Sequence, residues 1–369
     1  MIKILFFIDT TLASGGAEKV LRELVNNMDQ SKFDITVHTL WKEDADQYLA
    51  PGIRYRYIFE KKTPFSKCCF RLESLLGLTY RMHLKDDYDI EVAYLECGPT
   101  KVLAQSSNKK AKKVAWVHCD LAKMTSDVQN FISKATHWYA CFDQVVCVSR
   151  HTMQRYREMF PDNTESRVIY NTVDDLRIRE QSLEDLTGDI VKHKMTFATV
   201  GRMYHQKGYD RLLEAHRRLI SEGFDYDLWI LGDGPDRTAH ERFIAENHLE
   251  DSVRLLGFRK NPYPFIQAAD CIVCSSRYEG FSTVVTEALI LGKPVVTTPC
   301  SGMDELLGDN EFGLITEDSV EGIYQGMKRM LENPELREHY ARKATIRGRD
   351  FSKEKLVNQT EQFFEELLK

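Results

Sequence analysis

Along the whole chain, short apolar runs typical of β-strands alternate with amphipathic stretches typical of helices. The first run, IKILFFID at residues 2–9, is followed by two glycines and the helix-like AEKVLRELVNNM at 17–28. The same order resumes at MTFATVG, residues 195–201, and continues to KPVVTTPCSG at 293–302. Strands joined by helical crossovers pair in parallel and are buried on both faces, so the pattern predicts a mostly parallel sheet in each half of the chain.

A polar and acidic stretch at residues 175–194 interrupts this alternation. A chain of 369 residues with 43% apolar residues is long for one core and suggests two domains of roughly 150 to 200 residues. We expect two doubly wound, Rossmann-like α/β domains that face each other across a cleft, one over residues 1–180 and one over residues 181–351. The last segment, residues 352–369, has a helical pattern capped by Ser352 and no strand after it, so it must dock on another part of the fold.

Charge and cysteine usage narrow the class of protein. The formal net charge of −6 disfavours a general nucleic-acid binder, which needs a basic field to neutralise phosphates. Asp9 interrupts the first apolar run and no other run is as long as a membrane span, so we expect a cytoplasmic protein. The nine cysteines then indicate reduced thiols, and we interpret the lone CxxC of Cys271 and Cys274 as part of a buried strand rather than a metal or redox site.

Two cations follow the first strand of the second half. In open α/β sheets, ligands bind beyond the carboxyl ends of the strands, so the loops that follow strands are candidate sites. Arg202 and Lys207 lie between the strand-like residues 195–200 and a helix that begins near Gly208. Such a pair suits a diphosphate, because arginine offers a planar fork and lysine a compact charge. The alternative is an exposed loop with solvated charges.

Glycines mark two further loops. Gly15 and Gly16 follow the first strand and open a helix, where free amides and the helix dipole attract an anion or a polar oxygen. A tight turn between strand and helix is an equally good interpretation. Gly232 and Gly234 lack the third glycine of a dinucleotide fingerprint, so they indicate only a turn where backbone can approach a ligand.

Two glutamates frame the segment EGFSTVVTE, with Glu279 in the loop after a strand and Glu287 about one turn into the next helix. Ser282 or Thr283 would cap that helix, and the amides near its start would face an anion. Each carboxylate could then accept hydrogen bonds from a pair of hydroxyl groups. A nucleoside diphosphate sugar presents this series of groups: ribose hydroxyls, diphosphate and sugar hydroxyls. The alternative is that the two acids merely complement the helix dipole. This would account for Glu279, but it accounts poorly for Glu287, which lies in an apolar stretch.

The segment EGFSTVVTE resembles the E-x7-E motif of retaining glycosyltransferases of family 4, which have the GT-B architecture. The resemblance extends over nearly the whole chain in a specific order and spacing. The matching pieces are GGAEK at 15–19, WVHCD at 116–120, VCVSR at 146–150, IYNTVD at 169–174, GRMYHQKG at 201–208, GDGP at 232–235, LLGF at 255–258, EALILGKPVV at 287–296 and GLIT at 313–316.

The resemblance implies roles for individual residues. Arg202 and Lys207 would hold the donor diphosphate, Glu279 the hydroxyls of the transferred sugar and Glu287 the ribose. His118 would lie beside the donor sugar, although a histidine at a strand end can also be a hydrogen-bonded core residue. The implied catalytic residues are Arg202, Lys207, Glu279 and His118, and the implied donor-binding residues are Gly15, Gly16, Gly232, Gly280, Phe281, Ser282, Thr283 and Glu287.

The resemblance also implies the course of the reaction. The anomeric configuration would be retained, with the leaving phosphate serving as base for the acceptor hydroxyl. We expect no metal and no cofactor, and the acid-x-acid segments at 44–46 and 225–227 fall in polar stretches where surface positions are expected. In this family the final helix, residues 352–369 here, crosses back onto the N-terminal domain.

The sequence therefore predicts a metal-independent, retaining hexosyltransferase. It would move a hexose or N-acetylhexosamine from a nucleotide sugar, expected to be a UDP sugar, to a hydroxyl of a glycan or lipid-linked acceptor in the synthesis of capsule, exopolysaccharide or another cell-surface glycan. One alternative is a nucleotide-sugar epimerase on a similar scaffold, which would interconvert sugars from the donor alone. Another is a non-catalytic partner subunit of a glycosyltransferase. In such a subunit we would expect the charged residues of the site to have been replaced, whereas Arg202, Lys207, Glu279 and Glu287 are intact.

A basic and apolar stretch lies in the first half at residues 61–85. It contains six lysine or arginine residues and a single acid, Glu73, and leucine and aromatic residues are interleaved with them. Such a surface can lie on anionic headgroups, so we expect peripheral contact with the inner face of the cell membrane, with KKAKK at 109–113 assisting. The alternative is a helix whose apolar side packs on the domain core while its charges are solvated.

Overall fold

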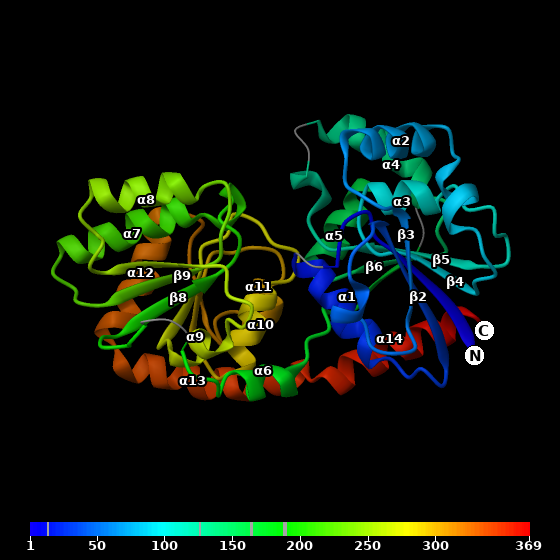
Figure 1. Cartoon of the computed structure of the whole chain (residues 1–369). Helices are drawn as coiled ribbons and strands as arrows, with labels where there is room; N and C mark the ends of the chain where they lie inside the picture. Colours follow the sequence, from blue (N-terminus) through cyan, green and yellow to red (C-terminus); the bar gives the residue numbers. More distant parts are fainter. Residues whose placement is uncertain (13–14, 125–126, 163–164, 187–189) are drawn as a thin grey trace. The chain divides into compact units, whose positions relative to one another are not determined.

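The computed structural model describes residues 1–12, 15–124, 127–162, 165–186 and 190–369. These residues form two compact units, Met1–Val173 with Lys353–Lys369, and Asp174–Ser352 (Figure 1). The predicted boundary between residues 180 and 181 falls inside helix α6 (Asp175–Gln181), which belongs to the second unit. Residues 187–189, in the polar stretch between the halves, lie outside the described residues.

The first unit is built on a parallel sheet in the strand order β3-β2-β1-β4-β5-β6-β7. Its strands are β1 (Ile2–Phe7), β2 (Phe33–Trp41), β3 (Arg54–Phe59), β4 (Ile90–Ala93), β5 (Lys112–Val117), β6 (Gln144–Cys147) and β7 (Ser166–Val168). Its helices are α1 (Gly16–Asn27), α2 (Pro64–Leu75), α3 (Gly98–Leu103), α4 (Val128–Tyr139), α5 (Arg150–Met159) and α14 (Lys353–Leu367), with shorter turns η1 (Ala45–Gln47), η2 (Tyr80–Leu84) and η3 (Leu121–Lys123).

The second unit repeats this plan in the strand order β10-β9-β8-β11-β12-β13. Its strands are β8 (Thr196–Val200), β9 (Asp227–Leu231), β10 (Val253–Gly257), β11 (Cys271–Cys274), β12 (Val295–Thr297) and β13 (Leu314–Ile315). Its helices are α6, α7 (Tyr209–Ser221), α8 (Arg237–Glu246), α9 (Tyr263–Ala268), α10 (Thr283–Ile290), α11 (Met303–Leu307), α12 (Val320–Glu332) and α13 (Pro334–Arg347), with η4 (His205–Lys207) and η5 (Gly348–Phe351).

Both sheets have the doubly wound order that the alternation of strands and helices predicts. In each, the chain first adds strands on one side of the first strand and then crosses to its other side, at β1/β4 and at β8/β11. Ligands of such sheets bind at this switch point, beyond the carboxyl ends of the strands. The α/β prediction is confirmed, and so is the buried-strand interpretation of Cys271 and Cys274, which lie in β11 with both side chains buried.

The C-terminal helix α14 belongs to the first unit, where it contacts α1 (Figure 1). Phe364 is fully buried, and its ring centroid lies 6.0 Å from that of Phe6, 6.4 Å from Phe33 and 6.5 Å from Trp116. The orphan helix of the sequence therefore returns to the first sheet, as expected. None of the described helices combines the length and the apolar sequence that crossing a membrane requires.

Truncation of Phe364 tests this docking. We expect Phe364→Ala to lower the free energy of unfolding of the first unit by about 3 to 5 kcal/mol, because it leaves a cavity among three aromatic rings. Urea unfolding followed by tryptophan fluorescence, which includes Trp116, measures the change. Leu368→Ala, at a half-exposed position just after α14, is the control and should change stability by less than about 0.5 kcal/mol. Equal, small effects of both variants would show that α14 is not part of this core.

Candidate active site

Two loops of the second unit meet at its switch point. The loop 201–208 leaves β8, and the loop 275–282 leaves β11, the strand that pairs with β8 in parallel. The backbone N–H of Arg277 donates to the Gln206 carbonyl at 2.7 Å, and the Gln206 side-chain amide donates to the Tyr278 carbonyl at 3.0 Å. Two motifs far apart in the sequence therefore form one site.

An ion pair joins the two loops. Lys207 Nζ lies 2.7 Å from Glu279 Oε1, and both side chains are largely buried. Burial lowers the pKa of Lys207, but the Glu279 carboxylate, together with Cys274 and Tyr209, more than offsets this and raises that pKa above its ordinary value. Lys207 is therefore a permanent cation at the carboxyl edge of the sheet. Ser276 Oγ donates to the same carboxylate oxygen at 2.6 Å, a contact that the sequence did not predict although this serine is the second residue after β11.

Arg202 is held differently from Lys207. Its guanidinium lies 4.9 Å from the centroid of the Tyr204 ring and donates to the Tyr204 hydroxyl at 3.2 Å. The side chain is exposed, and the structure shows no ion pair for it with any described residue. The aromatic contact fixes the plane of the guanidinium while its charge stays accessible to an anion.

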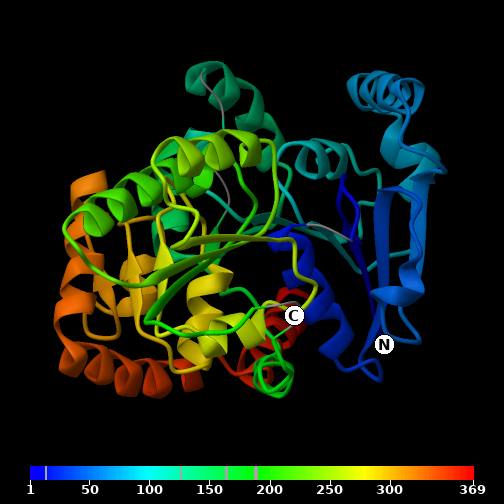
Figure 2. The same cartoon turned by 60° about the vertical axis from the view of Figure 1, so that its left-hand side comes forward.

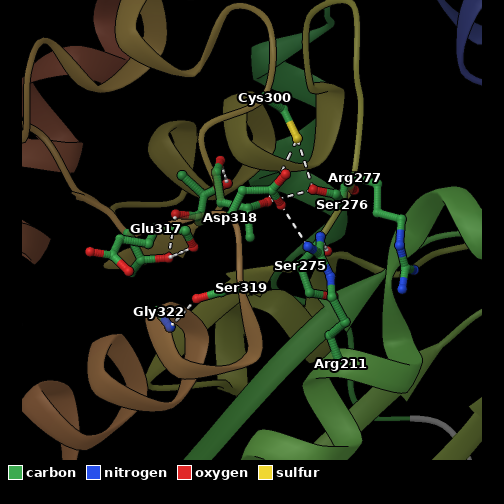
Figure 3. Close-up of polar contacts among 12 residues, drawn as sticks. Arg211, Ser275, Ser276, Arg277, Cys300, Glu317, Asp318, Ser319 and Gly322 are labelled. Carbon is green, nitrogen blue, oxygen red and sulfur yellow. Dashed lines mark hydrogen bonds and ion pairs between the residues drawn. The ribbon is translucent and has the colours of Figure 1, made fainter. Parts of the chain in front are cut away.

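Gly208 allows the two loops to approach. Its φ of +63° lies in the left-handed region, and a Cβ built there would lie 2.2 Å from the Ser275 carbonyl oxygen. Ser275 Oγ donates to the Lys207 carbonyl at 2.8 Å. Arg211 donates to the Ser275 carbonyl at 2.9 Å and pairs with Asp318 at 2.6 Å (Figure 3). A side chain at position 208 would therefore force the backbone of the two loops apart at Ser275.

The loop that follows β12 holds Ser276 from the other side. Cys300 Sγ donates to the Ser276 carbonyl at 2.8 Å (Figure 3). Thr298 Oγ1 donates to the same oxygen at 2.5 Å. Burial raises the pKa of the Cys300 thiol to about 12, so the group remains a protonated donor. Three successive loops of the sheet thus support the position of Glu279.

Helix α10 starts beside this ion pair. Ser282 is its N-cap and accepts from the Val285 N–H at 3.4 Å, which confirms the predicted cap. Gly280 and Phe281 are buried just before the helix and Thr283 begins it. Glu287 lies in α10 with 2% of its surface exposed. Glu279, which pairs with Lys207, therefore lies shortly before the start of α10, and a role of the first α10 amides in binding the donor stays a prediction.

The loop after β9 supports the one that carries Arg202. A Cβ at Gly232, where φ is +131°, would lie 1.9 Å from the Gly201 carbonyl oxygen. A Cβ at Gly234 would lie 2.5 Å from the Met203 carbonyl oxygen. The close backbone approach that these glycines allow is thus to the chain's own loop, and the donor-binding role of Gly232 stays a prediction.

The remaining predicted residues lie in the first unit, at the carboxyl edge of its sheet. Gly15, with φ of +109°, is the N-cap of α1, and both it and Gly16 are exposed. His118 follows β5, and its ring centroid lies 4.8 Å from that of Tyr94. Burial lowers the pKa of His118 to about 3, so the imidazole is neutral at physiological pH and can donate or accept a hydrogen bond.

Two acids at this edge were missed by the sequence reasoning. The Glu96 carboxylate accepts hydrogen bonds from the backbone N–H groups of His118 and, at 3.0 Å, Cys119. Burial, reinforced by the carboxylates of Glu96 and Glu18, raises the pKa of Asp9 to about 6. Asp9 and Glu96 follow β1 and β4, and an acid soon after a strand was the signal that could have identified them. Within the described part of the chain, no three His, Cys, Asp or Glu side chains are grouped as metal ligands.

Both halves of the chain match known families. Residues 14–177 match the model for Glycosyltransferase Family 4, and residues 187–347 match the model for Glycosyl transferases group 1. The chain is 30% identical over 359 residues to the N-acetylgalactosamine-N,N'-diacetylbacillosaminyl-diphospho-undecaprenol 4-alpha-N-acetylgalactosaminyltransferase of Campylobacter jejuni, covering 94% of this chain and 95% of that protein. It is 22% identical over 365 residues to the amylovoran biosynthesis glycosyltransferase AmsD of Erwinia amylovora, covering 97% and 98%.

Solved structures share the fold. Anabaena Alr3699/HepE in complex with UDP superposes with a TM-score of 0.76 at 19% identity, covering 99% of this chain and 100% of that one. The sucrose-phosphate synthase of Thermosynechococcus elongatus superposes with a TM-score of 0.82 at 17% identity, covering 100% and 99%. At these identities the likeness concerns the fold alone.

Proposed function

Because this chain belongs to the glycosyltransferases of family 4 and group 1, we propose that it is a retaining, metal-independent hexosyltransferase. It moves a hexose or N-acetylhexosamine from a UDP sugar to a hydroxyl of a glycan or lipid-linked acceptor. The observation that carries this proposal is the buried Lys207–Glu279 pair, next to the start of α10 and to the accessible cation Arg202.

The proposed reaction uses these charges at the leaving group. The bond between the anomeric carbon and the phosphate oxygen breaks, and its electron pair stays on the nucleoside diphosphate. Arg202, Lys207 and the first amides of α10 stabilise that growing negative charge more in the transition state than in the ground state. The acceptor hydroxyl bonds to the anomeric carbon on the face that the phosphate leaves, and its proton passes to a phosphate oxygen.

The remaining residues orient the donor in this proposal. Glu279 accepts hydrogen bonds from hydroxyls of the transferred sugar with the oxygen that Lys207 and Ser276 leave available, and Glu287 accepts from the ribose hydroxyls. The neutral imidazole of His118 hydrogen bonds the sugar, and the Gly15–Gly16 amides approach the diphosphate.

Names of related proteins support the proposed substrates. The Campylobacter relative is named as a transferase of N-acetylgalactosamine to a diphospho-undecaprenol-linked saccharide, and the Erwinia relative as a glycosyltransferase of amylovoran biosynthesis. The Anabaena structure is described as a complex with UDP. On this basis we propose a UDP sugar as donor, a lipid-linked saccharide as acceptor, and action at the inner face of the cell membrane through contact of residues 61–85.

A ligand screen tests the function. UDP and UDP sugars should raise the melting temperature, because a ligand at about 100 times its Kd stabilises the folded state by about 2.7 kcal/mol. Nuclear magnetic resonance of the product should then show the anomeric configuration of the donor. An inverted product would overturn the retaining mechanism, and interconversion of sugars from the donor alone would favour an epimerase.

Metal removal gives a separate prediction. We expect full activity in excess chelator, because two cationic side chains and a helix N-terminus supply the positive charge that the leaving diphosphate needs. Initial rates measured with and without EDTA test this. Loss of activity in EDTA that manganese restores would contradict the proposal.

A further inference from the structure

Helix α2 presents an apolar face to solvent. Its exposed apolar side chains recur three or four residues apart, the spacing that places them on one side of a helix. They are Phe65, Leu72, Leu75 and the C-cap Leu76, with exposed fractions of 78%, 56%, 72% and 59%, together with the exposed Cys68. Leu78 and Met82, just beyond the helix, are exposed as well. A helix of a globular domain normally turns this side to the core.

The opposite side of α2 faces the protein; it carries mainly polar residues, together with Phe70, which is partly buried against the core of the first unit. Ser66 and Ser74 are buried, and Ser66 Oγ accepts from Trp41 Nε1 at 3.4 Å. Glu73 Oε2 lies 3.1 Å from the Nε2 atom of His83. These polar contacts and Phe70 anchor the helix, and Phe65, Leu72, Leu75 and Leu76 are left outward. The alternative in which the apolar side packs on the domain core therefore holds for Phe70 and not for the four exposed residues.

Cations without an ion pair among the described residues lie within α2 and on both sides of it in the sequence. They are Lys61, Lys62, Lys67, Arg71, Arg81 and Lys85, all exposed. None of the six forms an ion pair with a described residue, and the Lys62 ammonium lies 4.7 Å from the centroid of the Trp41 ring. The acid within this stretch, Glu73, is engaged with His83. Apolar side chains with a basic border match the interface of an anionic bilayer, where the chains insert and the cations meet headgroups.

We propose that α2 inserts its apolar face, defined by Phe65, Cys68, Leu72, Leu75 and Leu76, into the headgroup layer of an anionic membrane. This inference rests on the proposed action at the membrane and names the helix that mediates it. Figure 2 shows α2, in mid-blue, at the outer rim of its unit.

The position of α2 determines which side of the first unit would meet the bilayer. The helix follows β3 closely, and its Ser66 contacts Trp41, the last residue of β2, so it lies at the carboxyl edge of the first sheet. His118 and Glu96 lie at the same edge, because all the strands of this sheet are parallel. Inserted α2 therefore brings the side of the first unit that carries His118 to the bilayer, where a lipid-linked saccharide is anchored.

Vesicle flotation of the full chain tests the inference. Wild type should float with vesicles of phosphatidylglycerol and phosphatidylcholine, and not with phosphatidylcholine alone. Leu72→Ser/Leu75→Ser should weaken binding at least about tenfold, because it removes inserted apolar surface. Lys67→Glu/Arg71→Glu should weaken it at about 0.01 M salt, where charges act over roughly 30 Å, and much less at about 1 M salt. Leu183→Ser/Ile346→Ser, at exposed apolar sites of the other unit, is the matched control and should float like wild type.

Fluorescence and mass measurements separate the outcomes. Phe65→Trp should shift its emission to the blue on anionic vesicles, and the melting temperatures of all variants should match wild type because the changed sites are exposed. Unchanged binding of Leu72→Ser/Leu75→Ser would overturn insertion and leave only electrostatic adsorption. A dimer in vesicle-free solution that the same substitution dissociates would assign the face to a second copy instead. Failure of wild type to float would overturn membrane contact altogether. The transferase proposal is tested separately, by the rate of sugar transfer to a soluble acceptor.

Discussion

Replacement of Lys207 by alanine is expected to lower kcat at least about a hundredfold, equivalent to about 2.7 kcal/mol of lost transition-state stabilisation. The lysine is a buried, permanently charged group 2.7 Å from Glu279, so its charge is already positioned before the diphosphate begins to leave. Arg202→Ala should have a comparable effect, because its guanidinium is fixed against Tyr204 and free of any carboxylate in the described residues. Steady-state kinetics with saturating donor measures both.

The ion pair makes controls necessary. Lys207→Ala leaves the Glu279 carboxylate buried without its partner, which can destabilise the fold by itself. The double variant Lys207→Ala/Glu279→Gln removes that unpaired charge, so it should recover the melting temperature without recovering activity. Lys194→Ala removes an exposed lysine near the amino end of the same strand and should leave kcat unchanged. Near wild-type kcat in a folded Lys207→Ala protein would refute the assignment of the diphosphate site.

The second large effect is that the two glutamates act on different quantities, Glu279 on kcat and Glu287 on UDP affinity. Glu279→Gln should lower kcat by about two orders of magnitude and leave UDP affinity nearly unchanged, because its carboxylate meets the transferred sugar and balances Lys207. Glu287→Gln should chiefly weaken binding of UDP itself, by about tenfold or more, because a hydrogen bond to a charged group contributes about 1.5 to 3 kcal/mol. Titration calorimetry with UDP and steady-state kinetics separate the two.

The control for this pair is Glu241→Gln, which changes an exposed acid of α8 that pairs with Arg237. It should alter neither quantity. An equal fall in UDP affinity in Glu279→Gln and Glu287→Gln would contradict the division, since Glu279 would then belong to the nucleotide site and not to the sugar site.

Only part of the candidate site could be predicted from local sequence patterns. Arg202, Lys207 and Glu279 could be placed at strand ends from the alternation of strands and helices, and Ser282 could be predicted as a cap from its place before a helix. The contacts of Thr298 and Cys300 with the Ser276 carbonyl could not, because they join the loops after β11 and β12, which only the order of strands in the sheet brings together. The same holds for Glu96, whose carboxylate binds backbone groups of the neighbouring strand's loop.

The orientation of helix α2 could not be predicted from the sequence. Its composition predicts an amphipathic basic helix, but periodicity is the same whether the apolar side faces the core or the solvent. The contacts of Ser66 with Trp41 and of Glu73 with His83 decide this, since they bind the polar side to the domain.

The sequence by itself determined two α/β halves, parallel sheets and the loops that carry the charged residues, because these depend on hydrophobic periodicity and on residue types at strand ends. Tertiary structure alone decided that Lys207 is held by Glu279, that the last helix packs its Phe364 against the first sheet, and that α2 turns its apolar side outward. These outcomes depend on contacts between segments distant in the chain, and local spacing carries no information about which distant partner a side chain meets.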